Sequence, residues 1–117
     1  MAYDTDLVKR IREYLSRFPE LTIEEKEMFR GLTFMVNGKM CVSVSGEEMM
    51  VRFDPAHHDR FAEKNGFRTM RIKNREYRGY GYISPDSIRN NKDFGFWIQQ
   101  CLDFNPRAKS SKNNIVQ

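Results

Sequence analysis

The hydrophobic positions of this chain change their spacing from segment to segment, and each spacing predicts a different element. Leu7, Ile11, Leu15 and Phe18 recur every three or four residues, which predicts an amphipathic helix near the amino terminus. Phe18 precedes a proline, and the residue before a proline avoids helical backbone angles, so the helix is expected to end there.

A second, short helix is expected over residues 22–28. Thr22 is followed three residues later by Glu25. This is the capping-box pattern, in which the two side chains satisfy the first backbone N–H groups of a helix.

Three consecutive strands are predicted next, over residues 32–36, 39–45 and 49–53. Asn37-Gly38 joins the first two, because both residue types accept the positive φ of a type I′ turn. The pairs predicted across this turn are Val36 with Lys39, Met35 with Met40, and Phe34 with Cys41. Apolar pairs thus fall on both faces of the hairpin. One face should pack under helices, and the other should meet something else, such as a second subunit.

The second half of the chain repeats this mixture. Asp54-Pro55 is a good helix start, because the aspartate caps the helix and proline lacks the N–H that would need a partner. That helix should run to about Lys64, and a second hairpin is expected over residues 67–72 and 77–84.

The last helix follows a less regular helical stretch that begins at Pro85. Its apolar stripe has the spacing i, i+3, i+4, i+7, i+8 and consists of Phe94, Trp97, Ile98, Cys101 and Leu102. From position 105 onward the chain is polar and basic, so we expect one domain over residues 1–104 and a disordered basic tail over residues 105–117.

The order of elements predicts the fold class. Helices, three strands, a helix, two strands and a helix give an α+β domain with two layers: a mostly antiparallel five-stranded sheet with helices packed on one face. The chain has 117 residues, which agrees with a single domain.

Composition narrows the location and the chemistry. No apolar run is long enough to span a membrane, and the polar amino terminus does not resemble a secretory signal, so a cytoplasmic location is expected. Cys41 and Cys101 are then expected to be reduced and buried. His57 and His58 are adjacent, whereas metal-binding pairs on helices are four residues apart, so both are expected to be exposed helix residues.

No cofactor or metal is expected, and the methionines at positions 35, 40, 49, 50 and 70 are interpreted as packing residues. Cys41 with His57 or His58 is the only conceivable catalytic pair, the sequence gives no sign that they meet, and no glycine-rich phosphate loop is present. We therefore expect no catalytic residues and no enzymatic activity.

The segment MFRGLTFMVNGKMC, followed by MMVR, resembles the opening of the TfoX amino-terminal domain family of bacterial proteins. The residues that carry the resemblance are Met28, Phe29, Gly31, Asn37, Gly38, Arg52 and Gly79. The resemblance implies a secretion-chaperone-like fold and a competence-regulator-like role. It implies a non-catalytic regulatory or adaptor domain that acts through protein–protein contacts with a partner it does not identify. We expect it to form a homodimer.

Direct nucleic-acid binding is the alternative hypothesis. Basic residues gather on the second predicted hairpin beside Tyr80, namely Arg68, Arg71, Lys73, Arg75 and Arg78. Arginines beside aromatic rings can bind phosphates and stack on bases, and the basic tail could add to this. However, adjacent strand residues face opposite sides, so a solvated surface paired with Glu47, Glu48 and Glu76 is also open.

Overall fold

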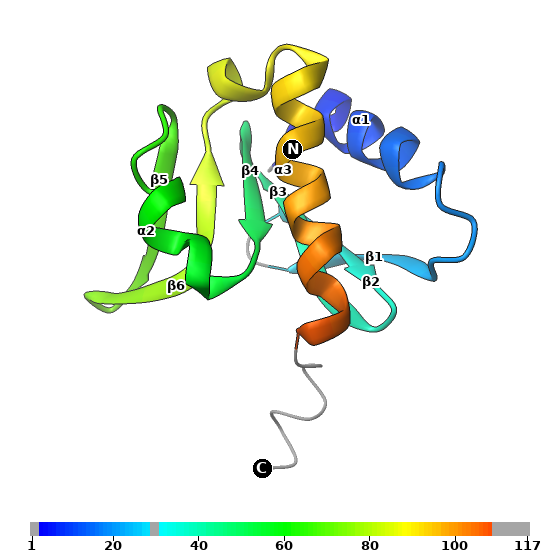
Figure 1. Ribbon diagram of the computed structural model, residues 1–117. Coiled ribbons are helices and arrows are strands. Elements are labelled where there is room, and N and C mark those ends of the chain that lie inside the picture. The colour runs from blue at the N-terminus through cyan, green and yellow to red at the C-terminus, as the bar shows by residue number, and fades with distance from the viewer. Residues whose placement is uncertain (1–2, 29–30, 109–117) are drawn as a thin grey trace.

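The computed structural model describes residues 3–28 and 31–108, and it is an α+β structure with helices on one side of an antiparallel sheet (Figure 1). In the described residues, six strands lie in the spatial order β1-β2-β3-β4-β6-β5. The strands are β1 (Ile23–Met28), β2 (Gly31–Val36), β3 (Lys39–Ser45), β4 (Glu48–Arg52), β5 (Phe67–Ile72) and β6 (Arg75–Ile83). The helices are α1 (Thr5–Leu15), α2 (His58–Phe61) and α3 (Asn91–Phe104), with 3₁₀ turns η1 (Pro55–His57), η2 (Pro85–Ile88) and η3 (Asn105–Arg107).

The fold class and the two-layer arrangement are as predicted, but the sheet has one strand more than expected. The short helix predicted over residues 22–28 is wrong, because this segment is strand β1. It pairs along its whole length with β2, from Ile23 opposite Val36 to Met28 opposite Gly31. A continuous ladder outweighs the local preference of a capping box. The charged residues of β1 suit an edge strand, since they discourage pairing with other chains.

The first hairpin contains the predicted turn and an unpredicted bulge. Asn37 and Gly38 both have positive φ, 52° and 81°, and the Val36–Lys39 and Met35–Met40 pairs are confirmed. The Phe34–Cys41 pair is wrong, because a bulge shifts the register and places Val42 opposite Phe34. The bulge sends Cys41 to the helix side of the sheet together with Val42.

The helix expected from residue 54 to residue 64 is shorter in the structure. Asp54 does cap it, accepting a hydrogen bond from the N–H of Ala56, but regular helix ends at Phe61. Gly66 has a φ of +84° and redirects the chain into β5. The second hairpin turns at Lys73 and Asn74.

The last helix is confirmed, but regular structure continues beyond it in the 3₁₀ turn η3. The tail was expected to begin at residue 105, yet Asn105 is buried and donates a hydrogen bond to the backbone oxygen of Val36. Lys39 Nζ also donates to the backbone oxygens of Asn105 and Pro106. These contacts fix η3 against the β2–β3 turn, so the expected boundary at 104 is too early by at least four residues. Residues 109–117 of the predicted tail lie outside the described residues.

The core is divided into two clusters by the sheet. The larger cluster contains helix residues, including Ile11, Phe61 and Trp97, packed on the strand residues of one sheet face. The smaller cluster contains strand residues alone. The prediction of apolar residues on both faces is therefore confirmed, and the second face is the starting point for the site.

Candidate functional site

The sheet face opposite the helices carries methionines and tyrosines. Its buried members are Met35, Met40, Met50 and Met70, and its partly buried members are Met28, Tyr77, Tyr80 and Tyr82. We refer to these eight residues as the methionine–tyrosine face. It receives side chains from all six described strands, so it extends across the sheet.

Strand register brings these side chains together. Met35 lies opposite Met40, Met50 opposite Tyr82, and Met70 opposite Tyr77. Directly opposed residues of antiparallel strands place their side chains on the same face, a few ångströms apart. The β4–β6 pairing thus brings residues distant in the sequence into one surface. The sequence predicted each hairpin separately and did not predict this pairing.

The methionines and the tyrosines differ in exposure. The four buried methionines expose only 1–7% of their surface. The three tyrosines are half-buried, and the rings of Tyr77 and Tyr80 meet edge to face with centroids 6.5 Å apart. Flexible thioether side chains thus form a thin apolar layer, and tyrosine rings present its outer surface.

Charged side chains of both signs border the tyrosines. Arg68 Nη2 lies 2.5 Å from Glu48 Oε1, and the Arg68 guanidinium lies 4.5 Å from the centre of the Tyr82 ring. Arg52 donates a hydrogen bond to the backbone oxygen of Met40 and lies 5.6 Å from the centre of the Tyr80 ring. The face is therefore amphipathic, with guanidinium groups stacked on aromatic rings.

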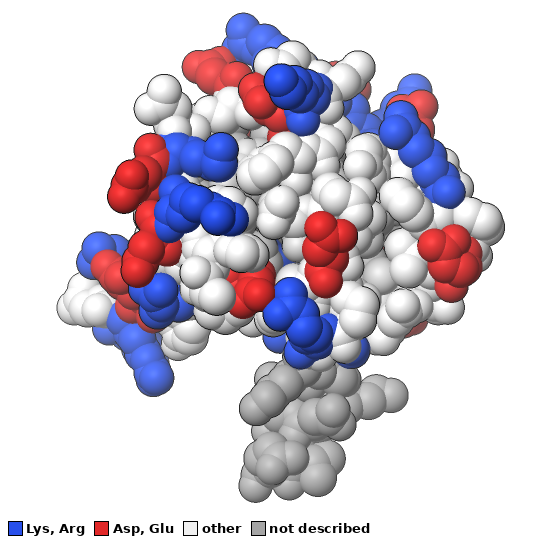
Figure 2. Space-filling model, in the orientation of Figure 1, with Lys and Arg blue, Asp and Glu red and all other residues white. Residues whose placement is uncertain are grey.

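The basic residues predicted to contact nucleic acid do not form one free positive surface. Besides the Arg68–Glu48 pair, Arg71 pairs with Glu76 at 2.6 Å. Figure 2 shows acidic and basic side chains interleaved on the side of the molecule where β5 and β6 lie. The interpretation of a solvated, carboxylate-paired surface is confirmed for Glu48 and Glu76.

The remaining basic residues of the hairpin point in different directions. Arg78 Nη1 reaches Asp59 of α2 at 2.9 Å, and this hydrogen bond lowers the pKa of the Asp59 carboxyl. Arg75 lies 5.8 Å from the centre of the Tyr77 ring. Lys73 occupies the turn. Tyr80, by contrast, belongs to the methionine–tyrosine face.

The residues that carried the family resemblance mostly shape the backbone. A Cβ at Gly31 would lie 1.8 Å from the backbone oxygen of Val44, so two strands meet closely there. Gly79 has a φ of +89°, which favours glycine. Asn37 and Gly38 form the turn, whereas Met28 at the end of β1 belongs to the methionine–tyrosine face and Arg52 at the end of β4 lies beside it. Phe29 lies outside the described residues.

His58 differs from its expected exposure. It is 3% exposed, its Nδ1 accepts a hydrogen bond from the backbone N–H of Gly79, and its Nε2 lies 3.3 Å from Thr69 Oγ1. Desolvation lowers the pKa of His58, and the positive charge of Arg78 lowers it further. Both ring nitrogens of His58 thus have partners other than Cys41.

The two cysteines are buried free thiols, as expected. Burial raises the pKa of Cys101, and a hydrogen bond with the Cys41 thiol raises it further. Within residues 3–28 and 31–108, no three His, Cys, Asp or Glu side chains are grouped so that they could hold a metal ion. None of the described helices has the length and apolar character needed to cross a membrane.

Comparison with known proteins agrees with the resemblance in the sequence. The family model of the TfoX N-terminal domain matches residues 13–105, which is most of the chain and includes all six strands and α3. Neither the curated proteins nor the solved structures contain a match. The match covers the whole described sheet together with α2 and α3, and on this basis the chain belongs to the TfoX N-terminal domain family.

Proposed function

We propose that this chain is a non-catalytic, competence-regulator-like adaptor domain that acts through protein–protein contacts made by its methionine–tyrosine face. The observation that carries the proposal is an apolar cluster on a sheet face to which no described helix contributes a residue. Two thiols that are not joined in a disulfide suit a reducing cytoplasm, which is the location we propose.

The composition of the face favours a protein partner. Tyrosine and methionine are enriched at protein interfaces, where tyrosine supplies a large ring together with a polar group. Methionine is flexible and can repack against different surfaces. Half-buried Tyr77, Tyr80 and Tyr82 are thus contact residues over an adaptable layer.

The charge pattern favours a second copy of the chain as the partner. A two-fold symmetric interface brings the same patch together with itself, so a patch of a single charge sign would repel its copy. Arg68 pairs with Glu48 beside the Tyr82 ring, and Arg52 lies beside the Tyr80 ring, so this surface carries both signs. We therefore propose a homodimer formed through this face.

Sedimentation over a range of protein concentrations tests the proposal. Tyr80→Glu places a charge in the face and should weaken self-association by at least about tenfold, or ~1.4 kcal/mol. Gln100→Glu makes the same charge change on α3 and should leave self-association unchanged. A wild-type protein that stays monomeric at high micromolar concentration would contradict the homodimer, as would equal effects of the two substitutions.

A further inference from the structure

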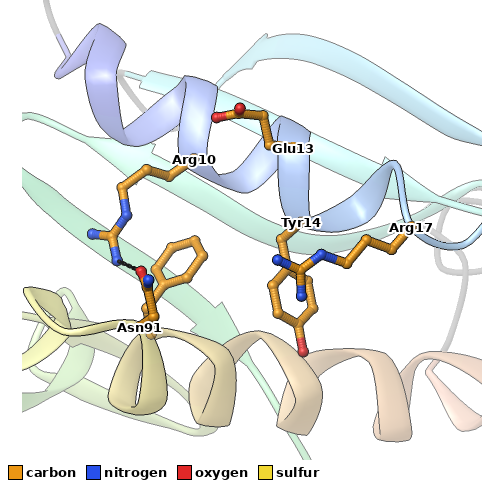
Figure 3. Close-up of a pocket in the computed structure, with 6 residues that line it drawn as sticks. Arg10, Glu13, Tyr14, Arg17 and Asn91 are labelled. Carbon is orange, nitrogen blue, oxygen red and sulfur yellow. Dashed lines mark hydrogen bonds between the residues drawn. The ribbon is translucent and has the colours of Figure 1, made fainter.

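A second candidate site lies on the helix-bearing side of the sheet. A hollow of about 230 Å³ separates α1 from the first turn of α3 (Figure 3). Its walls carry Arg10 of α1, Arg17 of the turn that follows α1, and the rings of Tyr14 and Phe94. None of these residues belongs to the methionine–tyrosine face.

Cations and rings alternate along this hollow. The Arg10 guanidinium lies 4.1 Å from the centre of the Phe94 ring. The Phe94 and Tyr14 rings meet edge to face with centroids 6.0 Å apart, and the Arg17 guanidinium lies 4.9 Å from the centre of the Tyr14 ring. Residues 10 and 14 share one face of α1 because they are four positions apart, and Arg17 follows just after the helix end at Leu15. The hollow thus has an aromatic floor with a guanidinium near each end.

Arg10 is held in position by the opposite wall. Its Nη1 donates to the backbone oxygen of Ile88 at 2.8 Å, and its Nη2 donates to Asn91 Oδ1 at 3.5 Å. A guanidinium has five N–H donors, so Arg10 keeps several donors for a ligand. Little side-chain entropy would then be lost on binding, because contacts with Ile88, Asn91 and Phe94 already fix the side chain.

The charge of the two guanidiniums is not neutralised by ion pairs. Among the residues that the structure describes, six other arginines form ion pairs with carboxylates, whereas Arg10 and Arg17 form none. Glu13 is the one carboxylate in the lining, and Figure 3 shows its side chain pointing along α1, away from α3. Two cations against one displaced carboxylate leave the hollow positive.

We propose that this hollow binds a small organic phosphate, a phosphomonoester with a planar ring. Guanidinium groups pair with phosphate oxygens through two parallel hydrogen bonds, and a phosphate dianion matches two guanidiniums in charge. The half-buried ring of Tyr14, backed by the buried Phe94 ring, provides the apolar surface for the organic part. The volume of the hollow suits a single small molecule.

Calorimetric titration of the full chain with phenyl phosphate tests this proposal. We expect phenyl phosphate to bind at least about tenfold more tightly than inorganic phosphate or phenol, because only phenyl phosphate engages both the guanidiniums and the rings. Equal affinities for phenyl phosphate and inorganic phosphate would overturn the proposal. Absence of binding at about 10 mM phenyl phosphate, a concentration at which even weak sites are occupied, would overturn it as well.

Two variants locate the binding. Arg17→Gln removes a guanidinium that makes no ion pair within the described chain, so the fold should persist while the affinity for phenyl phosphate falls by at least about tenfold. Arg12→Gln makes the same change nearby in α1, at a residue that instead pairs with Glu25, and should leave the affinity unchanged. Equal effects of the two substitutions would show only a general charge effect and would refute the assigned site.

Discussion

The Nδ1 atom of His58 accepts a hydrogen bond of 3.0 Å from the backbone N–H of Gly79, which joins α2 to β6. An imidazole nitrogen can accept a hydrogen bond only when it carries no proton, so this contact requires neutral His58 and leaves Nε2–H to donate to Thr69 Oγ1. Protonation would break the contact between α2 and the sheet. The buried position between the rings of Phe53 and Phe67 also disfavours a charge.

Stability should therefore fall as the pH is lowered from about 7.5 to about 5.5. An unfolded histidine has a pKa of about 6.5, and desolvation lowers the pKa of folded His58 below that value. Between the two pKa values the unfolded chain binds more protons than the folded chain. The free energy of unfolding therefore rises with pH in this range and falls on acidification. Urea unfolding at several pH values measures this slope.

Substitution of each histidine identifies the group responsible. His58→Asn keeps an acceptor near the Gly79 N–H but cannot be protonated, so the slope between pH 7.5 and 5.5 should flatten. The lost ring contacts should also lower stability by about 1–3 kcal/mol. His57→Asn changes the neighbouring, less buried histidine and should keep the wild-type slope. An unchanged slope in His58→Asn would show that another group titrates.

Gly31 should tolerate no side chain. A Cβ there would lie 1.8 Å from the backbone oxygen of Val44, and backbone of two paired strands cannot move aside cheaply. Gly31→Ala should thus destabilise the fold by more than about 3 kcal/mol. Gly95→Ala in α3 is the matched control, because a Cβ at this position would make an ordinary 3.5 Å contact with Tyr14 of α1. It should raise stability by about 0.5–1 kcal/mol through helix propensity, and equal thermal stabilities of the two variants would contradict this account.

The cysteines should react slowly in the folded protein. Burial raises the pKa of Cys101, and both thiols are 1% exposed. Alkylation near neutral pH should be at least about tenfold slower than in denaturant, because the thiolate is the reactive form. Ser16→Cys adds an exposed thiol that should react at the unfolded rate. Fast alkylation of wild-type protein would instead revive the hypothesis of thiol chemistry at Cys41.

The basic hairpin should bind DNA only weakly. Arg68, Arg71 and Arg78 each pair with a carboxylate, so few positive charges remain for phosphates. Fluorescence anisotropy with a labelled duplex at physiological salt should give no affinity tighter than the non-specific range of about 10⁻⁴–10⁻⁶ M. Nanomolar binding that Arg75→Glu with Arg78→Glu abolishes would favour the nucleic-acid hypothesis over our proposal.

Local patterns predicted most of the fold. The Asn37-Gly38 turn and the apolar stripe of α3 depend on neighbours a few residues away, and both were predicted correctly. Strand β1 was missed because its helix-capping pattern is local, whereas the ladder that decides its structure requires β2. The bulge at Phe34 was missed for a related reason, since the sheet and α3 select the side of Cys41.

The candidate sites depended more strongly on tertiary structure. Alternation along residues 77–84 already separated Tyr80 and Tyr82 from the glycines, and this signal could have pointed to the tyrosine surface. Their union with Met35 and Met50 required the β4–β6 pairing, which joins strands separated in the sequence by α2 and β5. The hollow beside Arg10 and Arg17 lies between α1 and α3, which are distant in the sequence, and had no counterpart in any local motif.

Asn105 should contribute to stability although it follows the last regular helix. Its side-chain amide donates a buried hydrogen bond of 3.1 Å to the backbone oxygen of Val36, beside the β2–β3 turn. Asn105→Ala leaves that buried oxygen without its side-chain donor, so the free energy of unfolding should fall by about 1–3 kcal/mol. Arg107→Ala, two residues on, removes a surface ion pair with Asp54 and should lower the free energy of unfolding less than Asn105→Ala does. Urea unfolding of both variants measures the difference. If Asn105→Ala costs no more than Arg107→Ala, then η3 rests on the β2–β3 turn without stabilising it, and the structural domain ends with α3.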